Sequence, residues 1–507
     1  MARVSRRAVL KYGAIGMSVT ALASGGGVGW AFLDATTDTA DRLDFDNALA
    51  IPPLADSEVD DDGRRTFALE ADIGELQIHP GEATTTWGLN GDYLGPTLRA
   101  TRGETVAISV TNNIGETTSL HWHGMHLPAA MDGGPHQEID PGDTWTPTWT
   151  IDQPAATLWY HPHPHGATAQ HVYRGAAGLF LVDDPEADAL GLPSEYGVDD
   201  IPVIVQDKNF DRANQFNESP TLMGDVGIVG DTILVNGTHA PYLEVGHELV
   251  RLRLLNASNA RVFAFGFVDE REFQLIATDG GLLPAPHTMT RIQLSPGERA
   301  EILVSFTPDE EVVLRGFPPD LGRVGAWSSR FDGGDDTFDI LQVRTASELH
   351  SAPAIPEELA PAPDLDLDGV ENPTRVFQLA GRSINNEHMD MRRINFATTV
   401  DSVEIWEVFN GHATHHNFHV HDVQFQVISV DGVEPPPELR GWKDTIFLPP
   451  YERFRIAMHF KNYTDPDVPY MYHCHILYHE DQGMMGQFVV VEPGQEPGLP
   501  ETDHAAH

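Results

Sequence analysis

The stretch Pro96–Asn113, PTLRATRGETVAISVTNN, points to the fold because a similar phrase occurs twice more along the chain. Its counterparts are PYLEVGHELVRLRLLNAS at Pro241–Ser258 and MRRINFATTVDSVEIWEVFN at Met391–Asn410. A phrase that returns at a regular interval indicates tandem structural units. The sequence therefore predicts three copies of one unit.

A second phrase follows each copy, and the residues within both phrases predict the type of unit. These second phrases are PGDTWTPTWTI at Pro141–Ile151, SPGERAEILVSF at Ser295–Phe306 and PPYERFRIAMHF at Pro449–Phe460. Apolar residues alternate with polar ones, as at Val106, Ile108 and Val110, and this period of two is typical of half-buried strands. With 46 Gly and 37 Pro to form turns, we predict an all-β chain of three tandem Greek-key β-sandwiches. The expected bounds are 49–185, 198–346 and 372–494.

The remaining segments are assigned by composition. Arg6 and Arg7 precede a weakly apolar, Gly/Ala-rich stretch, so residues 1–33 are predicted to be a twin-arginine export signal; an ordinary signal or an uncleaved anchor is the alternative. An acidic leader is expected at 34–48, within an acidic stretch that reaches residue 62 and is expected to be mostly disordered. A Pro- and Ala-rich linker is expected at 347–371. No later segment has the ~18–20 apolar residues of a membrane span. From the export signal we expect a periplasmic protein or an extracellular or cell-surface one.

The charge of the chain excludes one class of partner. Lys and Arg total 31 against 76 Asp and Glu, for a formal net charge of −45. Such a surface repels nucleic acid, and its self-repulsion is tolerated where salt is concentrated because the Debye length falls to roughly 3 Å at 1 M. We therefore predict no nucleic-acid binding and a halophilic source, with a generally acidic exported protein as the alternative.

The 25 histidines include four His-x-His pairs. Residues i and i+2 of a strand share a face, so each pair presents two imidazoles to one place. Two pairs fall in the first predicted sandwich and two in the third, so all eight converge if these domains pack together. Neutral imidazole binds copper, iron, nickel and zinc alike; hydrogen-bonded strand histidines without metal are the alternative. The pairs are His121/His123, His161/His163, His419/His421 and His473/His475.

Cys474 is the only cysteine and lies between two of these histidines. A single cysteine excludes an intramolecular disulfide, a zinc knuckle and an iron–sulfur cluster. On a strand its side chain points away from both neighbours toward a second site, for which His416, His479 and Met484 are candidates. Two imidazoles, one thiolate and a distant thioether are the ligands of a blue electron-transfer copper. A buried apolar side chain or a catalytic nucleophile are the alternatives for the thiol.

The two predicted sites are joined by the backbone at Cys474. One residue faces the blue copper and its neighbours face the other site, so the peptide forms a short covalent path. Electrons that enter singly can then be used in a group, as the reduction of dioxygen to water requires.

The motifs HWHG, WYHPHPHG, HxxHxH and HCHxxxHxxxxM, in this order, resemble those of the multicopper oxidases over residues 49–494. The resemblance implies three cupredoxin domains, four coppers per chain and dioxygen as electron acceptor. It places the type 1 copper on His416, Cys474 and His479 with Met484 as axial ligand, and its spacing excludes His415 and Met485. The resemblance assigns His121 and His419 as ligands of the type 2 copper. It assigns the type 3 pair to His123, His161, His163, His421, His473 and His475.

The resemblance also bears on proton supply and substrate. Asp132 and Glu480 lie where similar oxidases carry acidic proton donors, although an acid in so acidic a chain can also be surface decoration. GWKDT and HEDQGMM resemble the copper efflux oxidases, whose Met-rich insert binds Cu(I), yet residues 347–388 contain no Met. Laccase-like oxidation of phenols is therefore favoured, and oxidation of Cu(I) or another metal ion stays open.

Other functions were weighed against this one. A non-catalytic cupredoxin-fold structural protein would have lost ligands, and all the expected ones are present. A copper nitrite reductase uses type 1 and type 2 sites without a type 3 pair. The partners expected are dioxygen and a small reducing substrate, and the chain is expected to be a monomer.

Overall fold

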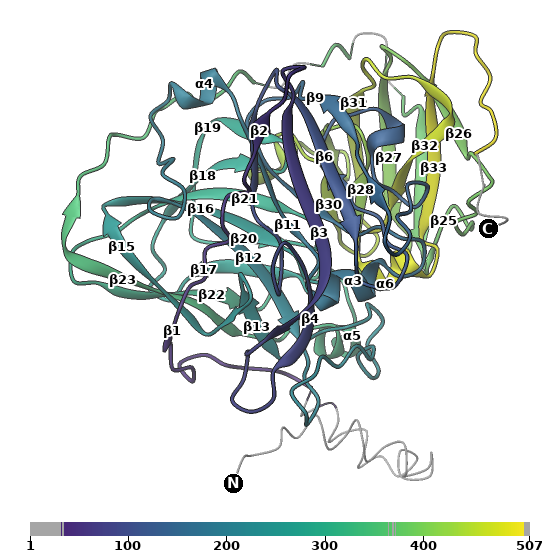
Figure 1. Cartoon of the computed structure of the whole chain (residues 1–507). Helices are drawn as coiled ribbons and strands as arrows, with labels where there is room; N and C mark the ends of the chain where they lie inside the picture. Colours follow the sequence, from purple (N-terminus) through teal and green to yellow (C-terminus); the bar gives the residue numbers. More distant parts are fainter. Residues whose placement is uncertain (1–31, 33–34, 363–364, 368–369, 371, 501–507) are drawn as a thin grey trace, which may run out of the picture.

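The computed structural model of the chain describes residues 32, 35–362, 365–367, 370 and 372–500, and it consists of three β-sandwiches (Figure 1). Each sandwich is a pair of sheets, so the predicted all-β architecture is confirmed. The predicted export signal lies outside the described residues except for Phe32. Within the described part of the chain no helix is both long and apolar enough to span a membrane.

The first sandwich carries two of the four histidine pairs. One sheet contains β2 (Glu58–Val59), β3 (Arg65–Leu76), β6 (Thr105–Asn112) and β8 (Thr144–Trp145), with β4 (Thr84–Leu89) on β3 and β9 (Thr148–Thr150) on β6. The other runs β5 (Leu98–Thr101), β11 (Gly178–Asp183), β10 (Ala156–His161), β7 (His121–His123). The helices are η2 (Ala129–Met131), α3 (Thr168–Arg174) and α4 (Pro185–Asp188).

The second sandwich has no histidine pair. One sheet runs β1 (Asn47–Ala48), β15 (Pro241–His247), β23 (Phe338–His350), β22 (Glu311–Phe317), β17 (Phe263–Phe267), β20 (Ile292–Leu294). The other runs β14 (Thr238–His239), β13 (Thr232–Val235), β12 (Asp200–Lys208), β16 (Leu249–Asn256), β21 (Arg299–Ser305), β18 (Phe273–Thr278), β19 (Gly281–Met289). Its one described α-helix is α5 (Ala326–Phe331).

The third sandwich carries the other two pairs and the cysteine. One sheet runs β25 (Ser383–Ile384), β24 (Arg375–Ala380), β27 (Val403–Asn410), β31 (Arg453–His459), β29 (Phe425–Val430). The other runs β26 (Phe396–Thr399), β33 (Met485–Val491), β32 (Asp465–His473), β28 (His416–Val420), β30 (Thr445–Leu448). The helices are η3 (Pro437–Leu439) and α6 (Leu477–Asp481).

The phrase that occurs three times forms the same substructure in each sandwich. Its first strand is β5, β15 or β26, and each pairs in parallel with a later strand of its own sandwich, namely β11, β23 or β33. Its second strand is β6, β16 or β27, and each joins the opposite sheet in parallel with β3, β12 or β24. The phrase therefore crosses from one sheet to the other, as Greek-key connections between two sheets do.

The prediction of disorder for most of the acidic stretch 34–62 is wrong for its described part, residues 35–62. The backbone N–H of Thr37 donates to Asp336 Oδ1 at 2.6 Å, and β1 pairs in parallel with β15 of the second sandwich. Leu49 is buried in the core of that sandwich. Acidic composition predicts disorder because such chains bury little apolar surface, but here an edge strand supplies backbone partners. The strand β1 and Leu49 thus pack with the second sandwich, and the earliest strand in the sheets of the first sandwich is β2.

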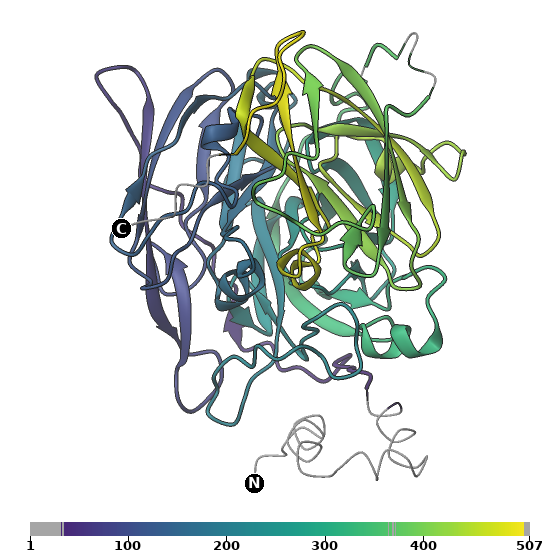
Figure 2. The same cartoon turned by 90° about the vertical axis from the view of Figure 1, so that its right-hand side faces the viewer.

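The first and third sandwiches lie side by side, with α3 and α6 in contact (Figure 2). Direct bonds join them: Tyr470 Oη donates to the carbonyl of Leu127 at 2.7 Å, and His136 Nε2 lies 2.8 Å from Gln487 Oε1. This contact is the packing that the distribution of histidine pairs required.

Candidate metal centres

The eight paired histidines meet between the first and third sandwiches. In the first, β7 pairs with β10 so that His121 lies opposite His161. In the third, β28 pairs with β32 so that His419 lies opposite His473. All eight imidazoles are at most 1% exposed. Two strand pairs, one from each domain, therefore form one buried imidazole cluster.

The strand geometry differs in part from the prediction. Only His121 and His123 both lie within a strand, because β10, β28 and β32 end before the second histidine of their pair. Cys474 likewise follows the last residue of β32. The alternation of side chains continues past the strand ends, so each pair still reaches one place.

Nitrogen distances divide six of the eight histidines into two groups of three. His161 Nε2 lies 3.4 Å from both His123 Nδ1 and His475 Nε2. In the second group, His473 Nε2 lies 3.2 Å from both His163 Nε2 and His421 Nε2. Two nitrogens bound at about 2 Å to one metal at a tetrahedral angle are separated by roughly 3.3 Å. In the second group the three ligand nitrogens also lie within 4.8 Å of one another, so this group has the spacing of ligands around a single ion. The two distances in the first group match that spacing.

The remaining two histidines, His121 and His419, point free nitrogens into the cluster. Their Nδ1 atoms bond the carbonyl oxygens of Asp132 at 3.0 Å and Asp444 at 2.9 Å. Among the described residues neither Nε2 has a hydrogen-bond partner. Buried polar atoms are almost always partnered, so these two nitrogens fit a third ion.

Burial fixes the charge state of five of the eight cluster imidazoles. It lowers the pKa of His163 to about 4 and that of His475 to about 3, and it lowers the pKa of His123, His161 and His419 well below the usual value. The rings are therefore neutral at pH 7, which is the form that binds metal.

A second centre lies on the other side of Cys474. Its Sγ is 3.7 Å from Nδ1 of both His416 and His479, and these two nitrogens are 3.2 Å apart. The backbone N–H of Cys474 donates to the carbonyl of Met484 at 3.1 Å, and both side chains belong to one buried apolar cluster. The donor set is that of a blue copper site. Met485 pairs with His473 across β32 and β33, so it lies on the other face from Met484.

Two predicted acids contact the outer nitrogens of the cluster. Asp132 Oδ2 lies 2.7 Å from His421 Nδ1 and its Oδ1 3.4 Å from His121 Nδ1. Glu480 lies between two rings, with Oε2 3.2 Å from His473 Nδ1 and Oε1 3.5 Å from His163 Nδ1. Both acids are 1% exposed, so the surface alternative does not apply to them. Each carboxylate contacts one imidazole from the first sandwich and one from the third, as outer partners of metal ligands do.

Three functional contacts were not foreseen from the sequence. Asp444 Oδ1 lies 3.0 Å from His123 Nε2, and Arg299 binds the same carboxylate. The carbonyl of Asp225 lies 3.0 Å from His479 Nε2. Each joins residues far apart in the chain, and the only sequence signal was that Lys443, Asp444 and Thr445 belong to the motif GWKDT.

Known proteins resemble this chain over nearly its whole described length. Family models described as multicopper oxidase match residues 71–187, 205–312 and 359–494. A protein named multicopper oxidase mco from Staphylococcus haemolyticus is 37% identical over 450 residues, covering 88% of this chain and 92% of that protein. One named cell division protein FtsP from Sodalis glossinidius is 37% identical over 452 residues, covering 87% and 92%. The crystal structure of a laccase from Pediococcus acidilactici superposes with a TM-score of 0.81 at 34% identity, covering 90% of this chain and 96% of that one.

Proposed function

Because this chain belongs to the multicopper oxidase family, and is thus a copper-dependent oxidase, we propose that it couples one-electron oxidation of a phenolic substrate to reduction of dioxygen to water. Oxidation of Cu(I) or another reduced metal ion is the second candidate. One dioxygen takes four electrons and four protons to give two waters, so four substrate oxidations accompany each turnover.

We propose four coppers per chain, held as the two centres suggest. The type 1 copper is bound by His416, Cys474 and His479 with Met484 as axial ligand. The type 2 copper is bound by His121 and His419, whose free Nε2 atoms support this. The type 3 coppers are bound by the two groups of three, which are His123, His161, His475 and His163, His421, His473.

The observation that carries the proposal is the position of Cys474 between the two centres. Its Sγ faces His416 and His479, while the adjacent His473 and His475 face the imidazole cluster. When bound, the coppers supply one-electron storage on either side of this peptide. On each side of Cys474 a single peptide bond joins it to a histidine of the cluster.

The residues around the type 1 ligands prepare the site for metal and for substrate. Burial raises the pKa of the Cys474 thiol to about 12 and lowers that of His479 to about 4, so copper must displace the thiol proton while the imidazoles bind as they are. The carbonyl of Asp225 caps His479 Nε2, and the Asp225 side chain is 44% exposed. Asp225 thus lies between the outer edge of the His479 ring and solvent.

The environment of Asp225 favours a phenol over a soft metal ion. Its carboxylate is exposed and accepts from Thr414 Oγ1 at 2.9 Å and from Arg382 Nη2 at 3.2 Å. A carboxylate can take the proton that a phenol loses when it is oxidised, whereas a Cu(I) site calls for thioethers. The Arg382 guanidinium also lies over the Tyr478 ring at 5.0 Å, a contact that restrains the side chain bound to Asp225.

We propose that Asp132 and Glu480 hold the cluster histidines and supply protons to it. Both carboxylates contact outer nitrogens of ligand imidazoles, so a proton on either lies next to the cluster. Glu480→Gln keeps the shape of the side chain but can neither take up nor release a proton. Its turnover should fall about 10- to 100-fold, the range for outer partners of metal ligands, and its pH profile should change while the blue type 1 absorption persists. An unchanged pH profile would remove Glu480 from proton supply.

Two other functions predict different metal contents. A non-catalytic relative would hold few coppers or none, and a nitrite reductase two per chain, whereas the proposal requires four. The intact convergence of all eight histidines favours the oxidase over both.

Oxygen consumption by the copper-loaded protein tests the function directly. Phenols and Cu(I) are each supplied as sole reductant, and peroxide is measured beside oxygen uptake. We expect uptake with phenols at four electrons per dioxygen and without peroxide, and a lower kcat/KM for Cu(I). No uptake with either class of reductant would refute the proposed activity.

We further propose that the chain is exported through the twin-arginine pathway. Changing both Arg6 and Arg7 to Lys preserves charge but removes the arginine pair. Fractionation should then find the protein retained in the cytoplasm, and unchanged export would refute the pathway.

A further inference from the structure

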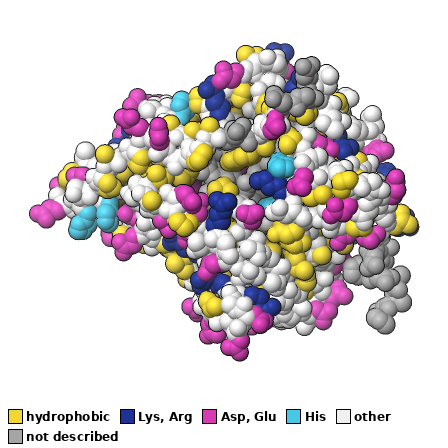
Figure 3. All heavy atoms as spheres, turned by 90° about the horizontal axis from the view of Figure 1, so that it is seen from above, with side chains coloured by type: hydrophobic (Ala, Val, Ile, Leu, Met, Phe, Trp, Pro, Cys, Tyr) yellow, Lys and Arg dark blue, Asp and Glu magenta, His cyan; other side chains and the backbone are white. Residues whose placement is uncertain are grey.

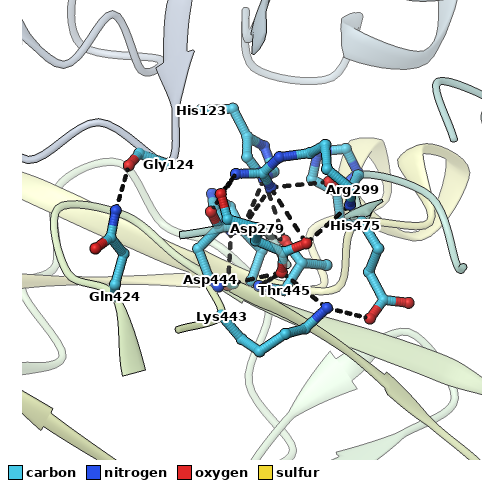
Figure 4. A network of polar contacts seen from close by, with 12 residues as sticks. His123, Gly124, Asp279, Arg299, Gln424, Lys443, Asp444, Thr445 and His475 are labelled. Atoms are coloured by element: carbon cyan, nitrogen blue, oxygen red, sulfur yellow. Dashed lines mark hydrogen bonds and ion pairs between the residues drawn. The ribbon is translucent and has the colours of Figure 1, made fainter. Parts of the chain in front are cut away.

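A buried ionic network lies where all three sandwiches meet (Figure 4). Arg299 begins β21 of the second sandwich, Asp444 and Thr445 lie at the start of β30 of the third, and His123 ends β7 of the first. The side chains of Arg299 and Asp444 are 0% exposed. The second sandwich, which supplies none of the proposed ligands, thus reaches a ligand through one carboxylate.

Every N–H of the Arg299 guanidinium has a partner in this network. Nη1 and Nη2 bind Asp444 Oδ1 and Oδ2 at 2.8 and 2.6 Å. Nε donates to the carbonyl of Thr157 at 3.0 Å, and the remaining donors reach the carbonyls of Gly297 at 3.1 Å and Asp279 at 2.9 Å. The Asp444 carboxylate is therefore held in one position by a rigid, two-point contact.

A second buried cation, Lys443, binds the acidic residues beside Arg299. Lys443 Nζ lies 3.0 Å from Asp279 Oδ2 and 2.8 Å from Glu298 Oε1. Asp279 also accepts from the backbone N–H of Arg299 at 2.8 Å. Buried ion pairs lose much of their Coulomb energy to desolvation, so such a network contributes little net stability. Its fixed geometry suggests a role in positioning.

The fixed carboxylate selects one tautomer of His123. His123 Nε2 lies 3.0 Å from Asp444 Oδ1 and 3.1 Å from Thr445 Oγ1. A carboxylate tied to Arg299 only accepts hydrogen bonds, so Nε2 carries the proton and Nδ1 keeps the lone pair. That Nδ1 faces His161 at 3.4 Å.

His123 is reversed relative to its neighbours in the cluster. In His121, His161, His163, His419, His421 and His473, Nδ1 faces outward to an oxygen atom. His123 alone of these seven uses Nε2 for that outward contact. An imidazole with the opposite orientation needs a partner of its own to hold it.

Two glycines leave the space that the contact requires. A Cβ at Gly124, where φ is +85°, would lie 2.5 Å from Asp444 Oδ2 and 2.7 Å from Arg299 Nη2. A Cβ at Gly297, where φ is +87°, would lie 3.2 Å from the rings of His123 and His475. The absence of a side chain at Gly297 in the second sandwich and at Gly124 in the HWHG turn of the first thus makes room for this network.

We infer that Arg299 is a positioning residue of the second sandwich: by fixing the Asp444 carboxylate it holds His123 with Nδ1 toward the imidazole cluster. This inference rests on the proposed function, in which His123 is a type 3 ligand. The second domain then has a direct part in the geometry of the cluster in addition to its packing role.

The test compares Arg299→Lys and Asp444→Asn with a matched control, Arg253→Lys. Arg253 is also buried in the second sandwich, binds Asp200 at 2.6 and 2.9 Å through two nitrogens and contacts Thr157 Oγ1 at 2.7 Å. Its other hydrogen-bond partner is Glu301. The control therefore removes a similar two-point ion pair at the same boundary without touching an imidazole partner.

Two measurements are made on the full-length protein. The first is the His123 tautomer in the copper-free protein, read from nitrogen chemical shifts after ¹⁵N-histidine labelling and assigned by its loss in His123→Gln. The second is copper content and oxygen uptake after loading, with the blue type 1 absorption as an internal measure of folding.

In Arg299→Lys and Asp444→Asn we expect His123 to lose its single Nε2–H tautomer. Oxygen uptake should fall about 10- to 100-fold, with the blue absorption retained, while Arg253→Lys resembles the wild type in both measurements. An unchanged tautomer in both variants, or equal losses in Arg253→Lys, would overturn the inference. Wild-type protein that shows the fixed tautomer but takes up no oxygen would instead refute the proposed function and leave the positioning intact.

Discussion

His163 Nε2 and His473 Nε2 lie 3.2 Å apart although 310 positions separate them in the chain. One comes from the first sandwich and the other from the third, so this contact exists only when the two domains are packed together. The proposed centre of type 2 and type 3 coppers, the trinuclear centre, thus lies at an interface between domains, and its ligands differ from those of the type 1 centre.

Removing His163 should separate dioxygen reduction from substrate oxidation. His163→Gln takes one of three ligands from its group, so oxygen uptake should fall by at least about 100-fold, the upper end for losses at a metal site's outer partners. Anaerobic substrate should still bleach the blue absorption, because His416, Cys474 and His479 are unchanged. The control is His165→Gln, which alters an exposed histidine two residues along the same loop. Loss of bleaching in His163→Gln, or an equal loss of uptake in the control, would contradict separate centres.

The buried non-ligand histidine His415 should make the copper-free protein sensitive to acid. Burial lowers its pKa to about 3, and neither ring nitrogen has a hydrogen-bond partner among the described residues. In the unfolded chain its pKa is about 6.5, so as pH falls below that value only the unfolded state takes up the proton and stability is lost. Between pH 7 and pH 5 this amounts to about 2 kcal/mol.

Replacing His415 with Leu should remove that part of the pH dependence. Denaturant unfolding of the copper-free protein at both pH values should show the difference between them shrink by about 2 kcal/mol. Copper content after loading should stay at the wild-type value because His415 belongs to none of the ligand groups. An unchanged pH dependence would contradict the buried neutral ring, and a lost copper would make His415 a ligand.

The acidic surface should make stability depend on salt. Acidic side chains are scattered over the face seen in Figure 3, and the formal net charge of the chain is −45. Their repulsion is screened as the Debye length falls from about 10 Å at 0.1 M to about 3 Å at 1 M. The thermal unfolding midpoint should therefore rise with NaCl over this range, and more than it rises with a neutral osmolyte. A midpoint that is indifferent to the removal of salt would contradict a halophilic origin.

Local periodicity made much of the architecture predictable. The alternation at Val106, Ile108 and Val110 predicted a strand, and the similar phrases at Pro96, Pro241 and Met391 predicted three units of one kind. The structure shows that each phrase crosses between the two sheets of its sandwich. The His-x-His spacing predicted which imidazoles share a face, because alternation depends only on the chain itself. Their convergence in one cluster also required the first and third sandwiches to pack together.

Contacts between distant segments were not predictable in the same way. Arg299 and Asp444 are 145 positions apart, and their bond depends on how two domains pack. Disorder was predicted for most of residues 35–62 because their composition is acidic. The prediction could not foresee that β1 would pair with β15 at the edge of the second sandwich. The contact of Asp225 with His479 is made by its backbone carbonyl, which every residue type has, so the sequence could not indicate it.

The copper content and turnover of Cys474→Ser test the central claim most directly, because this thiol belongs to one centre while its neighbours belong to the other. Serine has nearly the same size but lacks the soft sulfur that a blue copper requires. The account predicts three coppers per chain in place of four, no blue absorption and no substrate-driven oxygen uptake, with the trinuclear signals retained. A variant that keeps its blue colour and consumes oxygen at the wild-type rate would contradict the account.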